Sequence, residues 1–292
     1  MENCWTDKSL LPMNYPKFIF SLIAFLGVFL IDAQELPKER FKQSSLDFNT
    51  KYENDSVVII IKNPLECPIR VNLFSDYLKD KKVIDDTLKI IIQEKSEKTI
   101  KIFTKNLEKE KVNFSSIAVS LGDINKTIKQ NHIAFPFMKG KKYKVIQSNQ
   151  GSFSHDNDYS RFAVDFNMKV GDTITSADDG FVVGVIRDYE YGKNDRQWIP
   201  YANFITVYHP HSGLFTQYVH LKKDGSFVKV GDAVKRNQPI GLSGATGFVS
   251  GEHLHFNVLV PTKNMTLKSV PFSFENNISS LRLKKNTRVK KD

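Results

Sequence analysis

The segment Gly251-Glu-His-Leu-His-Phe-Asn-Val258 places two histidines two positions apart inside an apolar run. On a β-strand, alternate side chains project from the same face, so His253 and His255 lie side by side while Leu254 and Phe256 point to the other face. Zinc-binding helices instead space their histidines four positions apart. The pattern therefore favours two imidazoles above a packed sheet, although a strand with two ordinary histidines would look the same.

The start of the chain predicts export. Residues 18–31 form an apolar run that follows Lys17, and this run is shorter than the roughly 20 residues that a membrane span needs. Its length fits the core of a secretory signal peptide. We expect a signal peptide over residues 1–33, cleaved near Ala33, with Met13 as an alternative start. The mature protein would be periplasmic or secreted, without stable membrane insertion; the alternative is an uncleaved anchor.

Composition and charge narrow the class of protein. With 292 residues, 40% of them hydrophobic and 25% charged, the chain can bury the cores of two domains. Its two cysteines are Cys4 and Cys67, and Cys4 would leave with the signal peptide, so no intramolecular disulfide is expected. The formal net charge of +10 suits anionic surfaces such as cell-wall polymers. No nucleic-acid-binding motif is present, so we predict no nucleic-acid partner.

Residues 34–135 contain short apolar segments separated by polar turns. Residues 57–61 end at Asn63-Pro64, and apolar side chains alternate with polar ones over residues 69–73. Strands at this spacing, with little helical periodicity, predict an antiparallel β-sandwich of immunoglobulin type. The segment has no cluster of catalytic residue types. We therefore expect an accessory domain with a positioning or binding role and no catalytic one.

Residues 136–265 are also rich in predicted strands, so the fold class is all-β. They hold most of the glycines and six of the seven histidines, and turn signals such as Asp179-Gly180 and Asp224-Gly225 recur. Residues 266–292 form a C-terminal tail that becomes strongly basic over residues 282–291. We expect the last dozen residues to be disordered.

Polar residues of the second domain could build a hydrolytic zinc site. Such a site needs three protein ligands, an open position for water, a general base and a donor for the oxyanion. His155, Asp165 and His255 would supply two imidazoles and a carboxylate, and His220 and His253 are available for the other two roles. Each motif taken singly is more often structural.

The ordered motifs resemble those of the lysostaphin-type (LytM-like) zinc metallo-endopeptidases, peptidase family M23. The resemblance covers about residues 136–262 and is carried by the following segments: His155 with Asp165, Tyr218-Val-His-Leu221, Val230-Gly-Asp-Ala-Val-Lys235, Gln238-Pro-Ile-Gly241, Gly244-Ala-Thr-Gly247 and His253-Leu-His-Phe256. It implies a compact antiparallel β domain with a groove, one zinc ion per chain, and the peptides of bacterial peptidoglycan as substrate. It also implies that His155, Asp165 and His255 bind the metal and that His220 and His253 are catalytic.

The sequence departs from the family pattern in places. The commoner pattern has its first metal ligand four residues before the aspartate, where this chain has Arg161, which cannot bind zinc. We assign His155 instead, since the longer loop resembles a variant of the family. Asn237 stands where glycine is usual, which is tolerable because asparagine adopts the left-handed conformation. His209 and His211 lie in a turn and are left out of the site.

Two questions stay open. The insertion of residues 187–201 is rich in aromatic residues and could either form a wall of the groove or be a surface loop whose Trp198 packs locally. The second question is function. An exported zinc metallo-endopeptidase that hydrolyses peptidoglycan peptides through a zinc-activated water is the leading hypothesis. A non-catalytic regulator or cell-wall-binding module of the same fold is the alternative, and Arg161 is its main support.

Overall fold

The structure, a computed structural model, describes residues 35–37, 47–103, 105, 107–108, 111–129 and 132–292. The predicted signal peptide, including Met13 and Ala33, therefore lies outside the described residues. By the contacts between its residues the chain divides after Leu36, and Pro37–Asp292 form one compact unit. Within the described ranges, no helix is long and apolar enough to cross a membrane.

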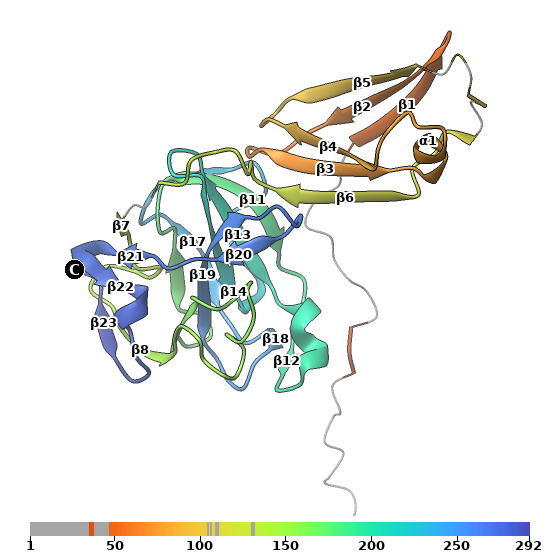
Figure 1. Cartoon of the computed structure of the whole chain (residues 1–292). Coiled ribbons are helices and arrows are strands. Elements are labelled where there is room, and N and C mark those ends of the chain that lie inside the picture. Colours follow the sequence, from red (N-terminus) through yellow and green to blue (C-terminus); the bar gives the residue numbers. More distant parts are fainter. Residues whose placement is uncertain (1–34, 38–46, 104, 106, 109–110, 130–131) are drawn as a thin grey trace, which may run out of the picture. The chain divides into compact units, whose positions relative to one another are not determined.

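The first part of this unit consists of two three-stranded antiparallel sheets (Figure 1). One has the order β1-β2-β5, with β1 (Asp47–Glu53), β2 (Ser56–Lys62) and β5 (Glu97–Phe103). The other has the order β4-β3-β6, with β3 (Ile69–Phe74), β4 (Thr87–Ile92) and β6 (Ser116–Leu121), and the short helix α1 (Asp76–Asp80) follows β3.

Alternation of apolar residues explains why these strands pair. Val57 and Ile59 of β2 and Val71 and Leu73 of β3 belong to one hydrophobic core, and all four are fully buried. Polar or charged residues occupy the intervening positions of β3. The predicted strands are thus present in both sheets, whereas their assignment to the immunoglobulin type stays a prediction.

From His132 onward most of the regular elements are again strands. The strands are β7 (His132–Ile133), β8 (Lys142–Gln147), β9 (Val164–Phe166), β10 (Thr173–Thr175), β11 (Gly180–Ile186), β12 (Gly192–Lys193), β13 (Phe204–His209), β14 (Leu214–Val219), β15 (Leu221–Ser226), β16 (Ala233–Val234), β17 (Pro239–Ser243), β18 (Gly247–Phe248), β19 (Leu254–Pro261), β20 (Leu267–Ser269), β21 (Ser273–Phe274), β22 (Ile278–Ser279) and β23 (Arg288–Lys290). Short 3₁₀ helices are η2 (Arg196–Tyr201), η3 (Glu275–Asn277) and η4 (Ser280–Arg282).

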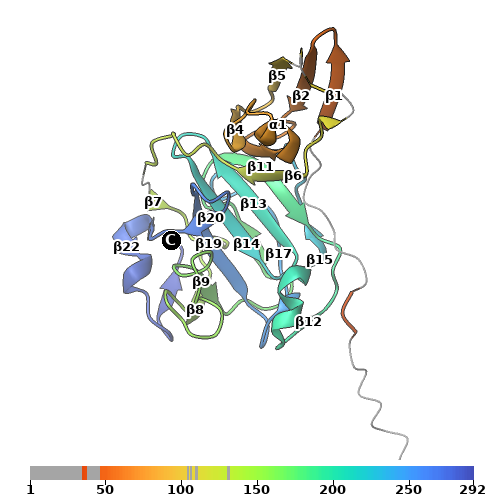
Figure 2. The same cartoon turned by 45° about the vertical axis from the view of Figure 1, so that its right-hand side comes forward.

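One large sheet organises this second part. Its strand order is β16-β11-β13-β14-β19-β9-β8-β23, and β20 pairs with β19 (Figures 1 and 2). A smaller sheet of order β10-β17-β15 shares a core with it, since Ile174, Leu221 and Ile240 of the small sheet join the buried side chains of the large one. The all-β class predicted from the sequence is therefore confirmed.

The alternation predicted for the His-x-His segment appears in β19. Leu254, Phe256 and Val258 lie in the core between the sheets, where the ring of Phe256 packs 5.8 Å from that of Phe274. His255 is directed to the opposite face. Burial of the apolar face thus fixes which residues the strand presents on its other side.

The C-terminal residues are ordered, and the prediction of disorder for the last dozen is wrong. Strand β23 pairs antiparallel with β8, and Val289 is buried opposite Tyr143. Lys291 is only 3% exposed, and its Nζ donates to the carbonyl of Phe135 at 2.7 Å and to Thr175 Oγ1 at 3.0 Å. Although this segment is highly charged, Val289 supplies an apolar side chain at the position needed to complete the edge of the sheet.

The buried Lys291 predicts a pH-dependent stability. Burial lowers the pKa of its ammonium group to about 8, below the value of about 10.4 in an unfolded chain. Between these values unfolding takes up a proton, so raising the pH favours the folded state. From pH 8 to pH 10 the unfolding free energy of the wild-type protein should rise by up to about 2 kcal/mol relative to Lys291→Met. Denaturant titrations of both proteins would measure this, and parallel pH profiles would contradict it.

Candidate metal centre

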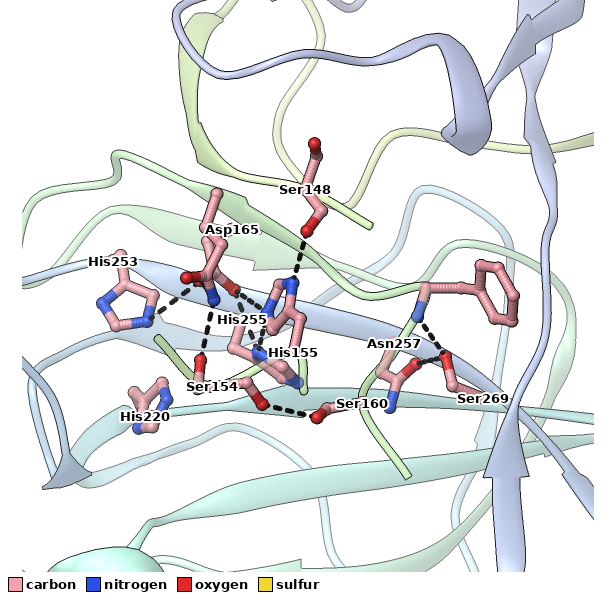
Figure 3. A network of polar contacts seen from close by, with 12 residues as sticks. Ser148, Ser154, His155, Ser160, Asp165, His220, His253, His255, Asn257 and Ser269 are labelled. Atoms are coloured by element: carbon pink, nitrogen blue, oxygen red, sulfur yellow. Dashed lines mark hydrogen bonds and ion pairs between the residues drawn. The ribbon is translucent and has the colours of Figure 1, made fainter. Parts of the chain in front are cut away.

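The pairing of β9 with β19 brings two polar side chains together. Asp165 is the register partner of His255, and directly opposed residues of antiparallel strands project from the same face of a sheet. His155 comes from the segment 148–163, which joins β8 to β9. Figure 3 shows the three side chains turned toward one another, although 90 positions separate Asp165 from His255 along the chain.

These three side chains form a tight and buried cluster. His255 Nδ1 lies 2.9 Å from Asp165 Oδ1, and His155 Nε2 lies 3.2 Å from the same oxygen. The two ring nitrogens are 3.2 Å apart. One ligand atom from each residue lies within 4.8 Å of the others. The structure therefore brings together the three residues that the sequence indicated as metal ligands.

The main chain determines which nitrogen of His155 faces the cluster. A carbonyl oxygen only accepts, so His155 Nδ1 must donate to the carbonyl of Ser148, 2.8 Å away. Nε2 is thereby left to bind a proton or a metal ion. Two imidazole nitrogens and one carboxylate oxygen are a donor set that zinc accepts, with a fourth position open for water. The residues present thus fit one zinc ion.

The protonation of the cluster follows from burial and proximity. Burial alone would raise the pKa of Asp165, but the imidazoles of His155 and His255 hold it well below its usual range. Burial lowers the pKa of His255, whereas at His155 the adjacent carboxylate outweighs burial and raises the pKa. Asp165 is therefore ionised, and a cation bound here would displace the proton of His155.

A second pair of histidines lies beside the cluster. His220 follows β14 and His253 precedes β19, and their ring centroids are 4.6 Å apart. His220 Nδ1 donates to the carbonyl of Thr246 at 2.7 Å, and His253 Nδ1 donates to that of Gly251 at 2.9 Å. Both rings therefore keep Nε2 for other chemistry. His253 Nε2 lies 3.9 Å from Asp165 Oδ2.

His220 is held in an unfavourable backbone conformation. Its φ of 68° lies in the left-handed region, which costs a residue other than glycine about 1–2 kcal/mol. Burial, followed by the neighbouring His253 and His255, lowers the pKa of its imidazole well below the usual value. Strain of this kind persists where the surroundings enforce it and is common at functional sites.

A cavity of about 420 Å³ opens beside the histidines and is lined in part by His220 and His255. Phe204, Val219 and Phe248 contribute apolar side chains to its lining. Ser154, Ser160 and Gln217 contribute polar groups. Polar and apolar groups together could hold a short stretch of peptide against the cluster.

The insertion of residues 187–201 contributes to this cavity. Arg196, Ile199 and Pro200 line it, while Trp198 and Tyr201 are buried in a small separate core. Both alternatives considered for the insertion therefore describe part of it, because some of its aromatic residues pack locally and its helix η2 forms a wall.

Several polar residues singled out in the sequence lie elsewhere. His209 contacts the carbonyl of Asp179 and Thr216 Oγ1, and His211 pairs with Asp178. Arg161 forms an ion pair with Asp158 at 3.2 Å and has no place in the cluster.

Sequence reasoning missed one residue beside the cluster. Gln147 donates to Asp165 Oδ2 at 3.2 Å and to Ser154 Oγ at 2.7 Å. Its place at the end of β8, as the register partner of Asp165, explains this contact, but the sequence did not reveal that pairing.

Comparison with known proteins gives a family match for the second part of the chain. Residues 160–267 match the model of peptidase family M23, the family that the sequence motifs resemble. His155 lies before the matched range, and its assignment therefore depends on the geometry described above.

The relatives are peptidases. An uncharacterized metalloprotease of Buchnera aphidicola subsp. Baizongia pistaciae is 34% identical over 141 residues, which cover 47% of this chain and 34% of that protein. Peptidoglycan DD-endopeptidase ShyB of Vibrio cholerae serotype O1 is 35% identical over 116 residues, which cover 40% and 24%. The matches thus span about a third of the first relative and about a quarter of the second. The lysostaphin catalytic domain from Staphylococcus simulans is 27% identical with a TM-score of 0.30, covering 44% of this chain and 87% of that one.

The geometry predicts that the protein binds one zinc ion through this cluster. His155→Ala should lower the zinc affinity by more than about a hundredfold, because removing a ligand should cost more than removing an outer-shell partner. His209→Ala is a matched control, since His209 is also buried but lies outside the cluster. Metal content and competition with a chelator would measure both. Wild-type affinity in the His155 variant would remove that residue from the ligand set.

Proposed function

We propose that this protein is an exported zinc metallo-endopeptidase that hydrolyses peptide bonds of peptidoglycan. The observation that carries the proposal is the convergence of His155, Asp165 and His255 beside a cavity that His220 also lines. A metal site with a neighbouring base and an accessible cavity is the arrangement that metal-assisted hydrolysis requires.

The roles of the residues follow from their hydrogen bonds. Zinc held by His155, Asp165 and His255 would supply a Lewis acid that activates water and polarises a carbonyl group. His220 and His253 each retain Nε2, because their Nδ1 atoms donate to main-chain carbonyls. An imidazole in this state can take the proton of an attacking water and, once protonated, can donate to the oxyanion of the tetrahedral intermediate.

The substrate is proposed from the relatives and the cavity. ShyB is a peptidoglycan DD-endopeptidase that shares 35% identity with this chain over 116 residues. The cavity combines apolar side chains with hydroxyl and amide groups, which suits a peptide better than a polyanion. Peptidoglycan lies outside the cytoplasmic membrane, so this function requires export, in agreement with the signal peptide proposed for residues 1–33.

We propose that the two N-terminal sheets are an accessory domain of immunoglobulin type. The strand orders β1-β2-β5 and β4-β3-β6 support this assignment, as does the presence of buried side chains of both sheets in one hydrophobic core. The domain would position the peptidase domain or bind a partner. We place the boundary between the two domains near residue 135.

Peptide release from purified sacculi tests the enzyme activity. Wild-type protein should generate new peptide termini, and a chelator should abolish the release until zinc is restored. His220→Ala and His253→Ala should retain zinc but lose at least about a hundredfold in turnover, because general acid–base groups contribute about that much. Termini can be labelled and counted, while metal content is measured on the same samples.

The control again is His209→Ala, which should release peptides at the wild-type rate. Normal turnover in either the His220 or the His253 variant would exclude that histidine from catalysis. Folded protein that binds sacculi but releases no peptide would favour a non-catalytic wall-binding module instead.

A further inference from the structure

The three proposed metal ligands are positioned by different means. Asp165 and His255 lie on paired strands, so sheet hydrogen bonds hold them. His155 lies in the segment 148–163, to which no strand is assigned. Backbone hydrogen bonds inside the segment, such as those from Gln150 to Arg161 at 2.7 Å and from His155 to Gly151 at 3.0 Å, shape its path, but they do not attach it to the sheets. The position of His155 therefore depends on what ties this segment to the sheets.

Two buried side chains, Asn257 and Ser269, form such a tie, and Figure 3 shows the hydrogen bond between them. Asn257 Nδ2 donates to the carbonyl of Tyr159 at 2.6 Å, and Asn257 Oδ1 accepts from Ser269 Oγ at 2.7 Å. Ser269 Oγ also accepts from the amide of Phe162 at 3.0 Å, and its own amide donates to the carbonyl of Asp158 at 2.8 Å. The stretch 158–162 is thus bonded to β19 and β20 at three main-chain positions.

The tied stretch connects directly to His155. Ser160 Oγ donates to the carbonyl of Ser154 at 2.6 Å, and Ser154 is the residue before His155. Gln147 of β8 donates to the hydroxyl of Ser154 at 2.7 Å. A short chain of hydrogen bonds therefore runs from Asn257 through the stretch 158–162 to the backbone that carries the imidazole.

Position 257 requires a side chain that can both donate and accept a hydrogen bond. Asn257 is fully buried and lies two positions after His255 on the same face of β19. Its amide must donate at one end and accept at the other, because its partners are a carbonyl and a hydroxyl. An aspartate has the same shape but cannot donate, and its charge would face the carbonyl of Tyr159 without compensation.

We propose that Asn257 and Ser269 are positioning residues that hold the segment 148–163 in place and thereby keep His155 within reach of the metal. The proposal rests on the proposed function, since it takes His155 to be a zinc ligand. It adds a role for two residues whose described hydrogen bonds do not go to the metal ligands and which are not among the residues that line the cavity. Outer partners of this kind commonly change metal affinity by about ten- to a hundredfold.

Asn257→Asp in the whole chain is the first test. Its zinc affinity, measured by competition with a chromophoric chelator, should fall by about ten- to a hundredfold. The buried charge should lower the unfolding free energy, so circular dichroism must show that the variant is folded before its zinc affinity is compared; the bond from the Tyr159 hydroxyl to Gln217 Oε1 at 3.1 Å is unaffected by the change. Ser269→Ala should show a smaller loss of affinity in the same direction. Wild-type affinity in both variants would overturn the proposal.

A matched control separates positioning from general destabilisation. Asn63 is a buried asparagine of the N-terminal sheets whose amide donates to the carbonyls of Cys67 at 2.8 Å and Gln93 at 2.7 Å. Asn63→Asp should lower the unfolding free energy without changing the zinc affinity. An equal loss of zinc affinity in this variant would mean that destabilisation alone explains the result for Asn257.

Combination with His155→Ala tests whether the effect passes through that residue. In the His155→Ala background, Asn257→Asp should cause little further loss of zinc affinity, because there is no longer an imidazole to position. A full additional loss would overturn the proposal. If His155→Ala itself leaves the zinc affinity unchanged, the assignment of His155 as a zinc ligand is wrong. This outcome differs from one in which His155 is a ligand but Asn257 does not position it.

Discussion

Asp165 and His255 meet because β9 and β19 pair in one register, and the rest of the site is arranged around that pair. A shift of one residue would turn His255 into the aromatic core and present Phe256 beside the carboxylate. Burial of Phe256 against Phe274 opposes such a shift, since a ring of that size stabilises the fold only when it is inside. Packing on one face of the sheet thus determines the chemistry on the other.

Three of the four histidines are oriented by the same kind of hydrogen bond. Burial of an imidazole is unfavourable unless its polar atoms find partners. His155, His220 and His253 each donate Nδ1–H to a main-chain carbonyl, so the backbone sets the tautomer and leaves Nε2 available. His255 differs, because its Nδ1 faces Asp165. One ring is therefore presented through the opposite nitrogen from the other three.

Much of the candidate site could be predicted because its residues lie in short sequence motifs. His-x-His within an apolar run, the placement of Asp165 and the left-handed conformation expected at Asn237, which has φ 69°, depend on a few neighbouring residues. The contacts of Gln147, Asn257 and Ser269 could not be predicted, because they join separate strands through their side chains. The order of the C-terminal segment was missed for a similar reason. Val289 is one apolar residue among many charges, and its burial depends on an edge strand far away in the sequence.

The last strand of the large sheet has a consequence for biosynthesis. Lys291 and β23 complete contacts with Phe135 and β8, and 156 positions separate Lys291 from Phe135. A chain that emerges from the ribosome with its N-terminus first exposes β8 long before its outer neighbour exists. Until then, β8 has an open edge that could pair with another chain. The large sheet can therefore be completed only after the segment that forms β23 has been synthesised, even if the metal cluster has already formed.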